Sequence, residues 1–195
     1  LASVDGSVNE NLIATLALRA MSKAKYSTSC SGHFGLAFDH YSHFTSPIRR
    51  YPDLQIHRII KENLRGRLTD NRIEHYQSIL DNVAKHSTDM EIQASEAERE
   101  SIKLKKAEYM LEHLGEEFDG VISGVKSWGI YVELPNTVEG MIEIAKVPGD
   151  YYNFVESEYA IIGERTGKRY SLGQSVRVVV EDVNIYNRTI DFSLV

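Results

Sequence analysis

The sequence predicts an α+β chain, in which a mainly helical part over residues 1–115 is followed by a small β-barrel over residues 116–195. The spacing of apolar residues is helical up to Gly115 and alternates along strands after it. The charge changes at the same place. Residues 1–115 carry 15 Lys or Arg against 15 Asp or Glu, and residues 116–195 carry 7 against 13, so the net charge of −6 lies entirely in the second part.

The first predicted helix starts at a capping box. Ser7 and Glu10 have the spacing of this motif, and apolar residues at helical spacing follow until about Lys23. Residues 26–45 mix serine, glycine, histidine and aromatic residues, which predicts a loop with short β-like pieces.

The second predicted helix starts at Ser46 and Pro47. Serine accepts hydrogen bonds from the unpaired amides of a helix start, and proline fits the first helical position. The helix is expected to run from Pro47 to Leu64. Pro52 removes one hydrogen bond of the ladder, so we expect a kink there.

Two more helices are expected before the barrel. The apolar spacing of Ile73–Val83 predicts an amphipathic helix that ends near Ser87. Thr88 and Glu91 form a second capping box, which predicts a further helix until Gly115. At about 1.5 Å per residue, that last helix is a rod of roughly 40 Å.

After Gly115, strand-length apolar segments are separated by turns. A first turn is expected at Lys126–Gly129. Five short strands within about 80 residues fit a small closed barrel, of which the OB-fold is the five-stranded case. Six segments are candidates for these strands: Phe118–Val125, Ile130–Val132, Met141–Ile142, Ala160–Ile162, Val176–Val180 and Ile190–Phe192.

Cysteine content and hydropathy indicate a cytoplasmic protein. Cys30 is the single cysteine, which excludes an internal disulfide framework and is typical of a reducing cytosol. The apolar run Leu12–Leu18 is far shorter than the roughly 20 residues that span a bilayer, so we expect no membrane contact. Because the chain opens at Leu1 in the middle of a pattern, we expect a fragment.

The densest group of candidate functional residues lies between His33 and His57. If Ser46 caps the second helix, Arg49 lies in its first turn, where the helix dipole disfavours a cation. Free amides, the dipole and a guanidinium would then converge on one phosphate. Successive helical residues differ by about 100°, so only one of Arg49 and Arg50 faces the cap, and we favour Arg49.

A structural alternative exists for the same residues. Arg49 can pair with Asp53 four positions along the helix, with His57 continuing a surface network, and both interpretations can hold together. Residues 49–67 carry six Lys or Arg against two Asp or Glu, a local charge of +4 that would attract a polyanion. A solvated helix face is the alternative for this charge.

Two other arrangements of reactive side chains are weaker candidates. Cys30 and His33, with His40 and His43, are zinc ligand types, but the short separation of the two pairs favours packed or hydrogen-bonded histidines. Ser46, His43 and Asp39 contain the atoms of a nucleophile triad. They lack the strand-turn-helix elbow of such sites.

Aromatic residues flank the first turn of the barrel. Trp128 and Tyr131 are candidate platforms for unpaired bases, each stack being worth about 1–3 kcal/mol, although one of the two is expected in the core on the alternative interpretation. Lys126, Arg177 and Arg188 are candidate phosphate contacts. Because this part of the chain is acidic, any hold on RNA must be local and salt-sensitive.

The run from His33 to Leu36, followed after four residues by Tyr41 to His57, resembles the signature of the RNB, or ribonuclease II, family of exoribonucleases. Within that family it looks most like the ribonuclease R branch. Residues 116–195 are similar to the OB-fold RNA-binding domain repeated in ribosomal protein S-one. The segments that carry this similarity are Gly120–Ile122, Trp128–Leu134, Glu139–Ile142 and Ile190–Leu194.

The resemblance implies processive hydrolysis of RNA from single-stranded 3′ ends to nucleoside 5′-monophosphates, with Mg²⁺ activating a water in the full-length enzyme. The arginine of the Ser-Pro-Ile-Arg segment, here Arg49, is implied to neutralise charge at the scissile phosphate. The other residues implied to contact RNA are Thr45, Ser46, Ile48 and Arg50 in the RNB part, and Lys126, Trp128, Tyr131 and Arg188 in the barrel.

Several parts of such an enzyme are not found in this sequence. The aspartate cluster that holds Mg²⁺ in the family lies in an upstream motif, so no cofactor is expected to bind this chain specifically and the 195 residues alone are predicted to be inactive. The cold-shock domains, the catalytic tyrosine and the basic tail are also not found. Glu143 stands where many such barrels have a histidine. The alternative function is a non-catalytic RNA-binding or adaptor module, and nothing indicates an oligomeric state.

Overall fold

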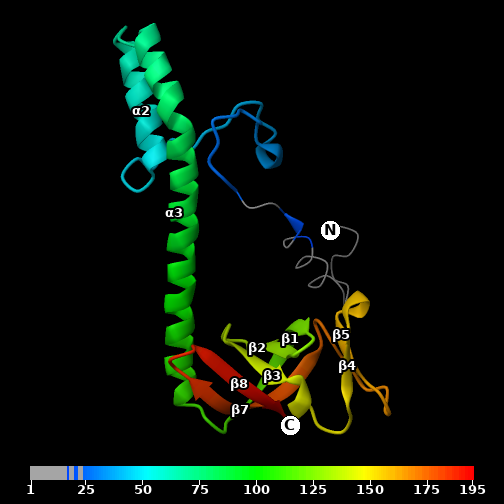
Figure 1. Cartoon of the computed structure of the whole chain (residues 1–195). Coiled ribbons are helices and arrows are strands. Elements are labelled where there is room, and N and C mark those ends of the chain that lie inside the picture. The colour runs from blue at the N-terminus through cyan, green and yellow to red at the C-terminus, as the bar shows by residue number, and fades with distance from the viewer. Residues whose placement is uncertain (1–16, 18–19, 22–23) are drawn as a thin grey trace. The chain divides into compact units, whose positions relative to one another are not determined.

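The computed structural model describes residues 17, 20–21 and 24–195 and consists of a helical part followed by a β part (Figure 1). The predicted α+β architecture is confirmed. Two compact units are present, one formed by Ser22–Glu98 and one that includes Arg99–Val195. The helix expected from Ser7 to about Lys23 lies mostly outside the described residues. None of the helices described is both long and apolar enough to cross a membrane.

The helical unit is built around a hairpin of two helices, α2 (Tyr51–Leu64) and the start of α3 (Asp70–Leu111), preceded by the short 3₁₀ helix η1 (Phe34–Leu36). The predicted break near Ser87 is wrong, because α3 continues through it for 42 residues, or about 63 Å. The Thr88 hydroxyl donates to the carbonyl of Ala84, one turn back in the same helix, at 2.9 Å. The residue therefore bonds within a helix and does not cap a new one.

A partly exposed ion pair closes the α2–α3 hairpin. Arg72 of α3 donates to Glu62 of α2 through Nε at 3.0 Å and through Nη2 at 2.8 Å. The hydroxyl of Tyr76 donates to the same carboxylate at 2.9 Å, and the Arg72 guanidinium lies 4.9 Å from the centre of the Tyr76 ring. Tyr76 is buried, so the hairpin has one apolar anchor beside its charges.

Five strands form a closed barrel with the order β1-β2-β3-β8-β7, as expected for an OB-fold. Neighbouring strands are antiparallel except β3 and β8, which meet in parallel through Met141 and Asp191. The strands of the barrel are β1 (Glu117–Lys126), β2 (Gly129–Glu133), β3 (Glu139–Glu143), β7 (Ser175–Asn184) and β8 (Thr189–Leu194).

A separate three-stranded sheet is inserted between β3 and β7. The segment Ala160–Ile162, which we expected among the barrel strands, belongs to its middle strand. Strand-like spacing indicates that a segment is a strand but not which sheet it joins, and this explains the error. The elements of the insertion are η2 (Ile144–Lys146), β4 (Tyr152–Val155), η3 (Glu156–Glu158), β5 (Ala160–Gly163) and β6 (Arg169–Ser171).

The barrel core includes the end of α3. Phe192 is wholly buried and lies over Gly140, where an added Cβ would come within 2.5 Å of the Phe192 ring, so only glycine fits there. Ala107 and Met110 of α3 are also wholly buried and belong to the same cluster. The compact unit of the barrel therefore contains helical residues that precede 116.

Asp150 holds the turn between β5 and β6. One oxygen of its carboxylate accepts from the Thr166 hydroxyl at 2.7 Å, from the Thr166 amide at 2.6 Å and from the Arg165 amide at 3.0 Å. These bonds, first the hydroxyl bond and then the amide bonds, lower the pKa of Asp150 from 3.8 to about 2. The folded chain therefore stabilises the ionised form of Asp150.

A carboxylate with a lowered pKa stabilises the fold above its ordinary pKa and loses this contribution as the pH falls through the folded value. We expect an NMR titration of Asp150 to have its midpoint at about pH 2, with the Thr166 amide signal following it. The variant Thr166→Val should raise the midpoint towards 3.8. A midpoint near 3.8 in the unaltered chain would contradict the assignment.

Candidate nucleic-acid interface

The segment before α2 is a tight turn rather than the first turn of a helix. The amides of Arg49 and Arg50 both donate to the carbonyl of Ser46, at 3.3 and 3.0 Å, and α2 begins only at Tyr51. The predicted start at Pro47 and the Ser46 cap are therefore wrong. The predicted kink is also wrong, because Pro52 lies in the first turn of α2, where its missing amide hydrogen has no helical partner to lose.

Asp53 of α2 holds this turn against the helix. It is wholly buried, and its Oδ2 atom accepts from the Ser46 amide at 2.8 Å and from Arg50 through Nε at 3.1 Å and Nη2 at 2.7 Å. Burial raises the pKa of Asp53, but the Ser46 amide and the Arg50 guanidinium outweigh it, so the pKa lies below its usual value. Asp53 is thus a charged clamp between the turn and the helix.

The guanidinium of Arg50 is engaged inside the protein. Besides the two bonds to Asp53, Nη1 lies 2.8 Å from Nδ1 of His43 and Nη2 lies 3.5 Å from the Thr45 hydroxyl. The expected pair between Arg49 and Asp53 is wrong, because Arg50 occupies that carboxylate. Direct contact of Arg50 with RNA stays a prediction.

Arg49 takes no part in this network among the described residues. Its side chain is exposed, and it has no ion-pair partner among the residues that the structure describes. The neighbouring Ile48 is also fully exposed, and Thr45 and Ser46 form the start of the same turn. Among the described residues, the turn therefore presents an exposed apolar side chain next to a cation without an ion-pair partner.

Aromatic and imidazole rings support the segment that leads to the turn. The ring of Phe44 stacks on that of His57 at 4.2 Å, and His57 Nε2 lies 2.9 Å from the Phe44 carbonyl. This contact replaces the predicted surface network through His57. Tyr41 packs edge-on against both His33 and His43, with ring centres 4.6 and 5.8 Å apart. The histidines are thus packed or hydrogen-bonded, as the simpler interpretation expected.

The zinc alternative finds no support in the part of the chain that the structure describes. Sγ of Cys30 lies 3.2 Å from Nδ1 of His40, so these two side chains do meet. However, no three histidine, cysteine or carboxylate side chains among the described residues come together in a way that would hold a metal ion.

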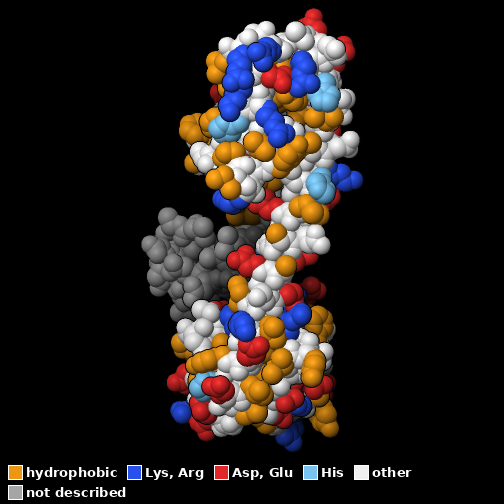
Figure 2. All heavy atoms as spheres, turned by 90° about the vertical axis from the view of Figure 1, so that its left-hand side faces the viewer, with side chains coloured by type: hydrophobic (Ala, Val, Ile, Leu, Met, Phe, Trp, Pro, Cys, Tyr) orange, Lys and Arg blue, Asp and Glu red, His pale blue; other side chains and the backbone are white. Residues whose placement is uncertain are grey.

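Lys and Arg side chains gather on the face of the hairpin that carries α2 (Figure 2). Five of the six cations between residues 49 and 67 are exposed: Arg49, Arg58, Lys61, Arg65 and Arg67. The two acids of this stretch face inward to partners, since Asp53 binds Arg50 and Glu62 binds Arg72. The exposed face is therefore more basic than the local composition indicates, and it suits a polyanion.

In the barrel, the predicted aromatic pair is held together at the first turn. Trp128 lies in the two-residue loop between β1 and β2 and is half exposed, and its indole Nε1 donates to the Tyr131 hydroxyl at 3.1 Å. Lys126 ends β1 beside it and is exposed. Glu143 pairs with Gly129 across β2 and β3, which puts an acid next to this loop.

The other predicted cations of the barrel are paired. Arg188 donates to Glu100 of α3 at 2.6 Å, and Arg177 donates to Glu117 of β1 at 2.9 Å. Both pairs are solvent-exposed, and such pairs contribute little stability, so the cations keep some capacity for phosphate. The structure thus brings Lys126, Trp128 and Tyr131 together in one hairpin and places Arg188 elsewhere, against α3.

Comparisons with known proteins agree for both parts of the chain. Residues 1–66 match the model of the RNB domain, and residues 113–194 match that of the S1 RNA-binding domain. Ribonuclease R from Aquifex aeolicus is 45% identical over 192 residues, which cover 98% of this chain and 27% of that protein. Ribonuclease R 1 from Lactococcus lactis is 43% identical, covering 97% of this chain and 23% of that protein.

A solved structure of Mycoplasma genitalium RNase R in complex with ribose methylated single-stranded RNA matches the whole chain with a TM-score of 0.91 and 29% identity, and the match covers 31% of that chain. The chain thus spans about a quarter of the length of the curated relatives. The similarity to the RNB signature that we described in the sequence is thereby confirmed.

The role of Asp53 as a clamp can be tested by hydrogen exchange. Removal of one partner of a buried ion pair costs about 3 kcal/mol or more, so Asp53→Ala should lower the protection of amides in the first turns of α2 roughly 100-fold. Asp53→Asn should give a smaller loss, and Asp89→Ala, which removes an exposed carboxylate of α3, should change nothing. Unaltered protection in Asp53→Ala would show that the clamp has no such role.

Proposed function

We propose that this chain forms part of a processive 3′ to 5′ exoribonuclease of the RNB family that releases nucleoside 5′-monophosphates, because residues 1–66 match the RNB domain and almost all of the chain matches ribonuclease R. In this proposal Arg49 neutralises charge at the scissile phosphate, and the S1 domain contacts the incoming single strand. The observation that carries the proposal is the turn at Ser46–Arg50, which presents an exposed arginine beside its clamped neighbour.

The different surroundings of Arg49 and Arg50 support the role proposed for Arg49. A guanidinium that acts on a phosphate must be positioned before the substrate arrives and must keep its donors free. The guanidinium of Arg50 contacts Asp53 and His43, and these contacts hold the turn in place. Arg49, one residue earlier, is left with its donors available, and Thr45, Ser46 and Ile48 border it along the proposed path of the RNA.

The described residues do not fit a magnesium site. No three carboxylate, histidine or cysteine side chains among them come together, and the one buried carboxylate of the RNB part, Asp53, is used by Arg50. The proposal therefore assigns this chain no part in holding the ion that hydrolysis would need. What it assigns is the charge at Arg49 and the contacts with RNA.

The S1 domain has a contact surface of its own. Half-exposed Trp128, linked to Tyr131 and flanked by Lys126, offers a ring face and a cation within one hairpin. Such a pair binds unpaired bases by stacking, without reading their sequence. Within the complete enzyme we assign it the role of guiding single-stranded RNA, with Arg188 and Arg50 as further predicted contacts.

The first test uses the 195-residue chain alone. We expect no release of mononucleotides from an end-labelled single-stranded RNA in the presence of Mg²⁺, because the described residues offer no metal site. The products are separated on a denaturing gel, with a complete ribonuclease R as the positive control. Release of mononucleotides at a stoichiometric rate would show that this chain contains a full catalytic site.

The second test concerns Arg49 in the complete enzyme. Removal of one preorganised donor at a developing charge lowers kcat by about 10²- to 10³-fold, so Arg49→Ala should lose turnover to that extent with little change in the RNA dissociation constant. Arg165→Ala, which removes an exposed arginine from the turn between β5 and β6, is the matched control. Equal losses of turnover and affinity in Arg49→Ala would identify a docking contact instead.

A further inference from the structure

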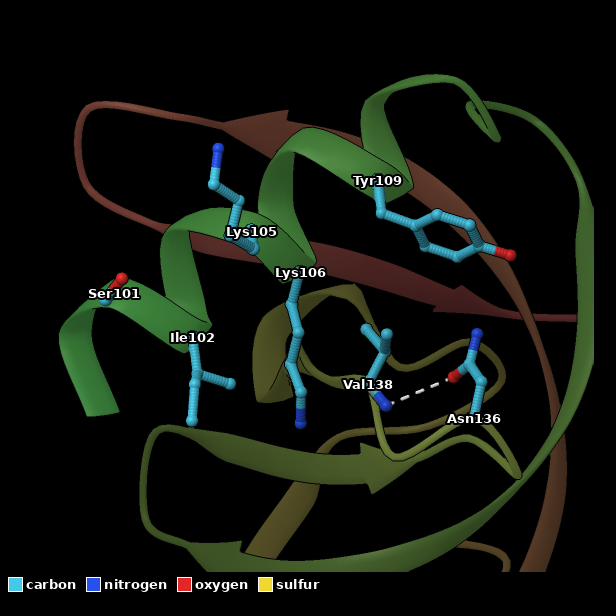
Figure 3. Close-up of a pocket in the computed structure, with 7 residues that line it drawn as sticks. All are labelled: Ser101, Ile102, Lys105, Lys106, Tyr109, Asn136 and Val138. Carbon is cyan, nitrogen blue, oxygen red and sulfur yellow. Dashed lines mark hydrogen bonds between the residues drawn. The ribbon is translucent and has the colours of Figure 1, made fainter. Parts of the chain in front are cut away.

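A groove lies in the unit that includes Arg99–Val195, between the last turns of α3 and the turn that joins β2 to β3 (Figure 3). It is separate from the Trp128 hairpin, because none of the residues that line the groove belongs to that hairpin. Its volume of about 380 Å³ is within the range of small-molecule sites. The residues that shape it are Ile102, Lys105, Lys106, Tyr109, Asn136 and Val138.

The walls of the groove are apolar and one of them is an exposed ring. Tyr109 is 50% exposed and Ile102 is 48% exposed, although both belong to a helix whose next turns enter the barrel core. The Tyr109 ring packs at a tilt against His113, with centres 4.6 Å apart, which limits its rotation. A held, exposed aromatic ring beside an aliphatic side chain is a platform for a flat group.

The polar atoms of the groove are already oriented. Asn136 accepts from the Val138 amide through Oδ1 at 3.1 Å, as the dashed line in Figure 3 shows. This bond turns the amide nitrogen of Asn136 towards other partners, and no hydrogen bond from it is present within the described residues. Lys106 donates to the carbonyl of Thr137 and fixes the loop against α3. The groove thus offers a donor beside its ring.

The charge around the groove differs from that of its unit. Residues 99–195 carry 11 Lys or Arg against 16 Asp or Glu, whereas residues 99–106 carry four cations against the single acid Glu100. This part of α3 is therefore the basic region of an acidic unit and would attract phosphates. Lys105 is highly exposed and is held by one acid, Glu108, at 2.7 Å.

We infer that this groove binds one nucleotide of single-stranded RNA, with the base against Tyr109 and Ile102 and an adjoining phosphate at Lys105. The inference rests on the proposed function, since it adds a second contact to a chain that handles RNA. A ring, an amide donor and an exposed lysine suit a base with its phosphate better than they suit an acidic peptide, which would leave the ring and the amide unused.

The test uses the ¹⁵N-labelled 195-residue chain and octaadenylate as the probe, followed by amide shifts. We expect shifts at residues 101–109 and 136–138 in addition to those near Trp128. Tyr109→Ala should abolish the first set, keep the second, and weaken binding about fivefold or more. Tyr151→Ala, which removes an exposed tyrosine just before β4, should bind as the unaltered chain does.

The Lys105–Glu108 pair gives a second measurement, the salt dependence of RNA affinity, which would not change if Lys105 had only a structural role. Lys105→Gln should weaken binding and reduce the slope of log affinity against log salt by about 0.7, the value for one phosphate contact on a single strand. Glu108→Gln releases Lys105 from its partner and should strengthen binding. A decrease in affinity in Glu108→Gln would count against phosphate binding at this lysine.

The outcomes separate this inference from the function on which it rests. Shifts near Trp128 without shifts at the groove would overturn the groove site and leave RNA binding by the S1 domain intact. Absence of octaadenylate binding anywhere would overturn both. Pentaglutamate that shifts the groove signals as strongly as octaadenylate would overturn the assignment to RNA and indicate a site for acidic peptides.

Discussion

The buried carboxylate of Asp53 decides what the RNB segment presents to its surroundings. Its Oδ2 atom receives one backbone amide and two guanidinium nitrogens, so a full negative charge is held where no water reaches it. A buried charge of this kind is tolerated only with such partners. The Ser46–Arg50 turn is consequently tied to α2 at both ends, and the residues between the two attachment points have to project outward.

This constraint also explains why two adjacent arginines have different surroundings. Arg50 contacts Asp53 and His43, whereas Arg49 is exposed and has no ion-pair partner among the described residues. Glu62 is likewise paired, through bonds from Arg72 and Tyr76. The acids of the segment are thus used to stabilise it, whereas most of its cations remain in solvent, which is the distribution that a polyanion-binding surface requires.

Local sequence patterns predicted the elements better than their ends. The barrel strands follow from alternation and turns, and the RNB segment follows from its signature. The predicted start of the second helix was wrong. Ser46 and Pro47 satisfy the local rule for a cap, but the bond from the Ser46 amide to Asp53 turns the chain differently. Thr88 has the spacing of a capping box, yet it continues α3 because its hydroxyl finds a carbonyl one turn back. The groove beside Tyr109 depends on a loop 27 residues further along the chain, at Asn136, and no local pattern reveals such a meeting.

The burial of Ala107 and Met110 shows that the folding unit of the barrel begins before the boundary of the S1 family model. The family model begins at residue 113, but two side chains of the preceding helix lie wholly inside the barrel core. A barrel excised at the family boundary would expose the apolar surface that these side chains cover, and it would lose their packing. The transferable piece of this protein is therefore the barrel together with the helix that enters it, and the two have to be inherited, cloned or recombined as one.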